Sequence, residues 1–134
     1  MAVANIAGYI ASLQERWNEA VDAGRRGVQL AWNCHAHHSL ALALCNLPDP
    51  LVRIGDVDAA ARLMAFAASF WERSIGPLSC DDVATVKNLR KRVVNHVGAA
   101  RATALWAQGE ALSLAQAVHL ALDDDARPIG FIVA

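Results

Sequence analysis

The densest group of chemically versatile side chains lies between residues 34 and 38. Cys34, His35, His37 and His38 offer thiol and imidazole donors, which are preferred ligands of zinc and of haem iron. On a continuous helix, His38 would lie one turn from Cys34, and His35 and His38 would share a face. A structural zinc site needs four ligands, however, and this spacing matches no established zinc signature. We therefore expect partly exposed histidines without metal or cofactor. A metal or small-ligand site at Cys34, His35 and His38 is the alternative.

Paired carboxylates are a second possible source of chemistry. Asp81 and Asp82, and the three aspartates at 123–125, could act as a general acid and base. Both groups fall at expected helix ends, where solvated caps and tails are common. The sequence contains no GxSxG nucleophile elbow, and Cys80 has no histidine in a recognisable order. The sequence therefore predicts no catalytic residue and a protein that is not an enzyme.

A short basic stretch is the only feature that suggests nucleic acid. Lys87, Arg90, Lys91 and Arg92 lie on one expected helix, with Arg101 further along. The formal net charge of the chain is −1, and no aromatic residue is interleaved for base stacking. A solvated helix face, or a surface for an acidic protein, is therefore expected in place of direct nucleic-acid binding.

Composition places the chain among helical proteins. It has 134 residues, of which 55% are hydrophobic, and the abundance of alanine and leucine favours helix over strand. Its three cysteines form no CxxC pair, which is typical of reduced thiols. No apolar run reaches the roughly 18 residues of a membrane span, and the N-terminus lacks a secretion signal. We expect a cytoplasmic protein without membrane contact, in which residues 1–125 form a single all-helical domain and residues 126–134 form a tail.

The histidine group must be positioned by helices in the first half of the chain. Apolar residues recur at helical spacing over residues 6–21, which predicts an amphipathic helix that closes near Gly24. A second helix, apolar on most faces, is expected over residues 28–47 and is predicted to be central. Residues 48–50, Pro-Asp-Pro, should then turn the chain, because proline lacks an amide donor.

Two longer helices follow. Asp56 introduces a helix that ends at Gly76, and Ser79 is a candidate N-cap for the next one. Apolar residues of 10–21 align at constant offset with those of 60–71, which is a weak indication of an internal repeat.

The C-terminal part should contain two short helices. Residues 99–108 are expected to form the first, ended by Gly109 in a left-handed cap. Ser113 and Gln116 have the spacing of a capping box, which would open the last helix. The tail from residue 126 carries Ile129, Phe131, Ile132 and Val133, which are apolar enough to dock on the body or on a second subunit.

The four tryptophans are expected to anchor the core. Trp32 is the one expected to be partly exposed, because it borders the histidine group on the most apolar helix. A peptide or small ligand could enter a groove between hairpins there. We therefore predict Trp32, His35 and His38 as residues that contact a partner or ligand.

Three stretches of sequence are similar to a known family. AWN at 31–33 through HSLA at 38–41 looks like the first helix of a final hairpin, and GDVDAAARL at 55–63 looks like its turn and second helix. ALWAQGEALSL at 104–114 resembles a terminal W-x-x-G-x-x-L-S-L ending. Over about residues 30–124 the chain resembles the far C-terminal tetratricopeptide-like region of large bacterial signalling ATPases and of LuxR-type or winged-helix transcriptional regulators.

The resemblance implies stacked helical hairpins closed by a short capping helix. It also implies a module that binds a protein partner or small effector on its concave surface, within a transcriptional or signal-transducing regulator. The ATPase part of such regulators is not in this sequence, because the only lysines, Lys87 and Lys91, follow no glycine and no phosphate loop can be drawn.

The sequence thus predicts an all-α fold of antiparallel helical hairpins, either a tetratricopeptide-like array or a compact helical bundle, with a short C-terminal capping helix. The predicted function is protein interaction or effector sensing. A free-standing bundle that binds a ligand or metal, and a homodimer that buries the apolar second helix and the tail between its subunits, are the alternatives.

Overall fold

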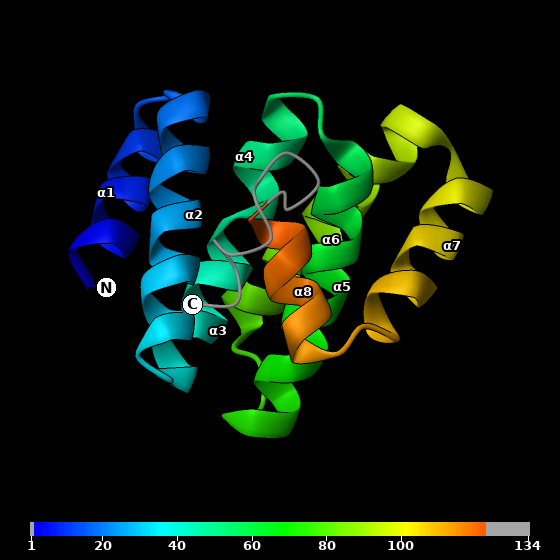
Figure 1. Ribbon diagram of the computed structural model, residues 1–134. Helices are drawn as coiled ribbons and strands as arrows, with labels where there is room; N and C mark the ends of the chain where they lie inside the picture. Colours follow the sequence, from blue (N-terminus) through cyan, green and yellow to red (C-terminus); the bar gives the residue numbers. More distant parts are fainter. Residues whose placement is uncertain (1, 123–134) are drawn as a thin grey trace.

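The computed structural model describes residues 2–122, and every element within that range is an α-helix (Figure 1). Short turns join the helices, and the last helix is short, so the predicted all-α fold of helical hairpins is confirmed. The expected boundary between the domain and its tail, the aspartates at 123–125 and the apolar tail residues lie outside the described residues. The helices are α1 (Ala2–Leu13), α2 (Trp17–Asn33), α3 (His37–Asn46), α4 (Pro48–Arg53), α5 (Val57–Ser74), α6 (Cys80–Val97), α7 (Ala99–Glu110) and α8 (Leu114–Ala121).

The central helix is α5, and not the segment 28–47 that the sequence suggested. It packs against α3 and α4 on one side, against α6 and α7 on another, and beneath α8 (Figure 1). Most of its residues are buried, and many of them are alanines, which allow neighbouring backbones to approach closely. The N-terminal hairpin of α1 and α2 lies at one end of the molecule and α7 at the other (Figure 1).

Three turns divide the first half of the chain in the same way. Glu15, His35 and Gly55 each adopt a left-handed conformation, with φ of 58°, 53° and 94°. In each turn, the N–H of this residue donates to the carbonyl three residues earlier, and the next N–H donates to the carbonyl five residues earlier. This pair of hydrogen bonds is the Schellman motif, which ends a helix.

Two sequence expectations are wrong because of these turns. The helix expected over 6–21 breaks at 14–16, and the helix expected over 28–47 breaks at 34–36. Glycine marks only one of the three left-handed positions, so Glu15 and His35 gave no signal. The three left-handed residues are spaced 20 residues apart along the chain. The helix pair α1–α2 therefore corresponds to the pair formed by α3–α4 and α5, with a repeat length of 40 residues. The apolar periodicity of the sequence suggested a repeat length of 50 residues.

Proline and glycine act differently from their expected roles at three positions. Pro48 begins α4, because a residue in the first helical turn needs no amide donor, so the expected turn at 48–50 is a bend between α3 and α4. Gly24 and Gly109 lie inside α2 and α7 and end neither helix. A Cβ on Gly24 would lie 2.9 Å from Leu47 Cδ1, and one on Gly109 would lie 2.3 Å from the Arg62 carbonyl oxygen. Both glycines therefore permit close helix contacts.

The remaining caps agree with the sequence. The Ser79 hydroxyl accepts a hydrogen bond from the Asp82 N–H at 3.1 Å, so Ser79 is the N-cap of α6. Ser113 and Gln116 form the expected reciprocal capping box at the start of α8: the Gln116 N–H donates to the Ser113 hydroxyl at 3.1 Å, and the Ser113 N–H donates to the Gln116 carboxamide oxygen at 2.9 Å.

Across residues 2–122, none of the helices has the length and apolar character that a membrane crossing requires.

Candidate functional site

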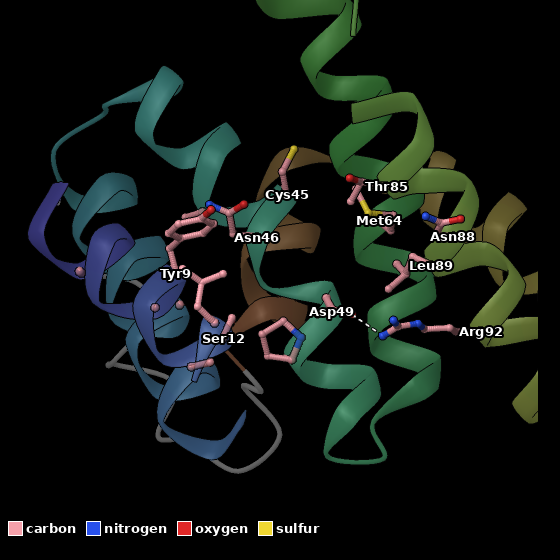
Figure 2. Close-up of a pocket in the computed structure, with 17 residues that line it drawn as sticks. Tyr9, Ser12, Cys45, Asn46, Asp49, Met64, Thr85, Asn88, Leu89 and Arg92 are labelled. Carbon is pink, nitrogen blue, oxygen red and sulfur yellow. Dashed lines mark hydrogen bonds and ion pairs between the residues drawn. The ribbon is translucent and has the colours of Figure 1, made fainter. Parts of the chain in front are cut away.

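A groove of about 430 Å³ lies between α1 and α6. Helices α3 and α4 run along its bottom, and α5 contributes one residue beneath α6 (Figure 2). Helix α2 contributes Ala20 and Gly24, so the groove depends on the packing of six helices, α1 to α6, whose lining residues range from Ala4 to Arg92.

One wall of the groove is the side of α1 that carries Gly8, Tyr9, Ser12 and Leu13. At Gly8 the two helices lie close together, so that a Cβ there would just contact the Ala23 Cβ of α2, at 3.5 Å. Tyr9 and Leu13 are largely exposed, so their side chains are available to anything that enters the groove.

The floor of the groove is apolar. It is formed by buried residues of three helices, Ala43 of α3, Pro50 of α4 and Met64 of α5, and Leu89 of α6 closes it from the opposite wall. Because these side chains belong to the main core or pack on it, the floor is a fixed surface for apolar groups of a ligand.

The rim of the groove carries neutral polar groups. Asn46 lies on the α3 side, and Thr85 and Asn88 lie on the α6 side (Figure 2). The Thr85 hydroxyl donates to the Asp81 carbonyl at 3.0 Å. Within residues 2–122, the carboxamides of Asn46 and Asn88 have no hydrogen-bond partner. Each carboxamide can donate and accept hydrogen bonds, as a peptide backbone does.

An ion pair closes one end of the groove. Arg92 of α6 donates to the Asp49 carboxylate of α4 at 2.9 Å, and Arg53 lies 3.6 Å from the same oxygen (Figure 2). The two side chains of the closer pair are about two-fifths exposed, so the pair contributes roughly 0–1 kcal/mol to stability. Its main effect on the groove is to leave that end without an unpaired charge.

Cys45 of α3 contributes a thiol to the lining of the groove. Burial, and to a lesser degree the nearby Asp82 carboxylate, raises the pKa of Cys45 to about 12. The thiolate is the reactive form of cysteine. At neutral pH Cys45 therefore stays protonated and serves as an apolar lining group, which gives the groove no activated thiol.

The residues predicted from sequence to contact a partner lie elsewhere. Trp32 is half-buried near the end of α2 and packs against the core. His35 occupies the left-handed position of the α2–α3 turn. His38 is exposed on α3, with its ring 5.7 Å from the ring of Trp71. The residues that line the groove do not include these three, so their part in binding stays a prediction.

The geometry assumed for a metal site at Cys34, His35 and His38 is wrong. The turn at 34–36 separates these residues, so they do not share one face of a continuous helix. In the part of the chain that the structure describes, no group of three or more histidine, cysteine or acidic side chains is arranged to hold a metal ion.

The arginines of the basic stretch, Arg90 and Arg92 of α6, are engaged within the protein, as is Arg101 of α7. The Arg90 guanidinium lies over the Trp106 ring at 4.9 Å, Arg92 pairs with Asp49, and Arg101 of α7 pairs with an aspartate of α5 at 2.8 Å. These contacts connect α6 and α7 to neighbouring helices, which accounts for the arginines without a nucleic acid.

Sequence reasoning missed the groove because its walls come from distant segments. One pattern in the sequence did point to the groove: Thr85, Asn88 and Arg92 recur at helical spacing on one face of a helix whose other inward face is apolar.

Comparisons of the chain with protein families, with curated proteins and with solved structures find no match.

Proposed function

We propose that this protein is a non-enzymatic interaction module that binds a peptide segment of a partner in the groove between α1 and α6. The observation that carries the proposal is the combination of an apolar floor with a rim of asparagine and hydroxyl side chains. A peptide presents the complement of this surface, with apolar side chains for the floor and backbone amides for the rim.

The charge of the groove favours a neutral peptide segment over an ionic ligand. Asp49 and Arg92, the charged residues that line it, are paired with each other. An added anion or cation would have to compete with this pair, whereas an apolar segment would not. The protonated Cys45 thiol fits a binding surface better than a catalytic one.

The wider role that we propose is that of a cytoplasmic helical-repeat module in a transcriptional or signal-transducing regulator. It rests on the resemblance of residues 30–124 to the tetratricopeptide-like region of such regulators. The Schellman turns at Glu15, His35 and Gly55 support it, because they give successive hairpins the same turn geometry. The partner is then a protein, and neither a nucleic acid nor a membrane is required.

Selection of displayed random peptides on the full chain tests the binding function. Peptides recovered on the wild-type protein are labelled and titrated by fluorescence anisotropy against two variants. Thr85→Trp fills the groove, whereas Thr103→Trp places the same bulk on the exposed surface of α7, outside the groove. We expect Thr85→Trp to weaken binding by about tenfold or more, which is about 1.4 kcal/mol, and Thr103→Trp to leave it unchanged.

Equal binding by the wild type and Thr85→Trp would contradict the groove as the site. A third variant, Trp32→Ala, then distinguishes binding in the groove from binding at Trp32, His35 and His38. The groove hypothesis predicts full binding by a folded Trp32→Ala protein, and the sequence-based hypothesis predicts that binding is lost.

A further inference from the structure

The exposed face of α1 carries a row of four large apolar side chains, Ile6, Tyr9, Ile10 and Leu13, here called the α1 stripe. We infer that the α1 stripe is the contact surface for a second copy of this chain, in a two-fold dimer with antiparallel α1 helices. This dimer goes beyond peptide binding but shares Tyr9 and Leu13 with the α1 wall of the groove. It differs from a dimer formed by the apolar second helix and the tail.

The α1 stripe is unusually exposed for its composition. The exposed fractions of Ile6, Tyr9, Ile10 and Leu13 are 57, 59, 44 and 66%. Their spacing of three and four residues places them on one side of the helix, a pattern that normally faces a core. The other side of α1, with the buried Ala4 and Ala11, already packs against α2. The helix therefore has two apolar faces, of which one is covered.

Other exposed apolar residues do not form such a row. Four others are each about two-fifths exposed, namely Leu30, Ile54, Ile75 and Val83, but they occur singly in different turns and helices. Scattered apolar residues are ordinary on protein surfaces, whereas a contiguous patch marks an interaction site.

The α1 stripe lies beside the groove and not within it. Tyr9 and Leu13 border both surfaces, while Ile6 and Ile10 are turned further away, since each residue advances the helix by about 100°. A partner on the α1 stripe therefore covers Tyr9 and Leu13 at the edge of the α1 wall and leaves the floor and the α6 wall of the groove free.

The sequence of α1 favours a second copy as this partner. A two-fold axis between Tyr9 and Ile10 would place Ile6 opposite Leu13, and Tyr9 opposite Ile10, so the α1 stripe is complementary to itself. An isologous contact requires such self-complementarity. No residue of Ala2–Leu13 is charged, so pairing α1 with α1 brings no like charges together and buries no unpaired ion.

Sedimentation equilibrium of the full chain tests this inference. We expect the wild type to dimerise with increasing concentration. Ile10→Glu should be monomeric at concentrations at which the wild type is dimeric, because it places two carboxylates near the axis. The matched control, Ile75→Glu, changes an isoleucine of similar exposure far from the α1 stripe and should retain the dimer.

A mixing experiment tests the antiparallel register. Ile6→Lys and Leu13→Glu chains should each be monomeric alone and should form a heterodimer when mixed, because Lys and Glu then face each other. Circular dichroism of each variant establishes that it is folded.

Three results would overturn the inference: a wild type that stays monomeric at every concentration, a dimer that survives Ile10→Glu, or variants that do not recover on mixing. In the first case the α1 stripe is left to residues 126–134 or to another protein. Thr85→Trp should not affect the dimer, so failure of the peptide-binding proposal and failure of this one are distinguishable.

Discussion

Gly109 sets the distance between α7 and α5, so replacing it with alanine should destabilise the protein. The added Cβ would lie 2.3 Å from the Arg62 carbonyl oxygen and 2.8 Å from the Ala65 Cβ. Ordinary contacts begin at 3.4 Å, so α7 must shift by about 1 Å. Both obstacles belong to α5 and cannot rotate away, because one is backbone and the other is a methyl group fixed to it.

The expected effect is the difference between two opposing contributions. Overpacking of this kind costs about 1–3 kcal/mol, because the shift separates the buried Leu105 and Trp106 of α7 from α5. Alanine is preferred to glycine inside a helix by about 1 kcal/mol, which offsets part of that cost. Because the closest obstacle is a backbone oxygen at 2.3 Å, the overpacking cost should lie in the upper part of that range, about 2–3 kcal/mol. We therefore expect Gly109→Ala to lower the free energy of unfolding by about 1–2 kcal/mol.

Urea denaturation followed by circular dichroism measures this change. The matched control is Gly8→Ala, the same substitution inside α1, where the nearest atom to the new Cβ is 3.5 Å away. Without a clash, only the helix preference remains, and Gly8→Ala should raise stability by about 0.5–1 kcal/mol. A Gly109→Ala protein as stable as the wild type would refute the proposed close contact between α7 and α5.

Three further predictions concern turns, a cap and a thiol. His35→Gly should raise the free energy of unfolding by about 0.5–1 kcal/mol, because glycine adopts the left-handed conformation without strain. Gly55→Ala should lower the free energy of unfolding by about 1 kcal/mol for the converse reason. Urea denaturation measures both changes, and a destabilised His35→Gly or a stabilised Gly55→Ala would contradict the turn assignment. Ser113→Ala should cost about 1 kcal/mol of stability through loss of the α8 cap, measured in the same way. Cys45, with its pKa raised from 9.0 to about 12 by burial, should react with a disulfide reagent more slowly at pH 8 than the exposed Cys80. Its contribution to stability should be present below pH 9 and be lost between pH 9 and about 12, because the thiol ionises first in the unfolded chain; equal reactivity of the two thiols would contradict its burial.

Apolar stripes and N-cap residues in the sequence correctly predicted the helices that carry them. The helix introduced by Asp56 was found because of its regular apolar stripe, and those opened by Ser79 and Ser113 because of their caps. These signals depend on neighbouring residues alone, so they could be recognised without the tertiary structure.

The errors arise where tertiary contacts override a local preference. Glu15 and His35 hold left-handed conformations that glycine usually occupies. Gly24 and Gly109 suggested helix ends but lie inside helices, where Gly24 contacts the Leu47 side chain and Gly109 permits the close approach of α7 to α5. Pro48 suggested a turn but fits the first turn of α4.

The groove could not be predicted for a different reason. Its walls come from α1 and α6, which are about seventy residues apart in the sequence and meet only through the packing of the helices between them. The predicted contact residues Trp32, His35 and His38 were chosen because they are neighbours in sequence, and the groove does not contain them.

The measurement that tests the central claim most directly is an NMR titration of the isotope-labelled full chain with a peptide selected on it. If the groove is the binding site, amide shifts should concentrate in residues 8–13 of α1, 43–50 of α3 and α4, and 85–92 of α6. Shifts concentrated at 32–38 would instead support the sequence-based site at Trp32, His35 and His38, and would contradict the account of the groove.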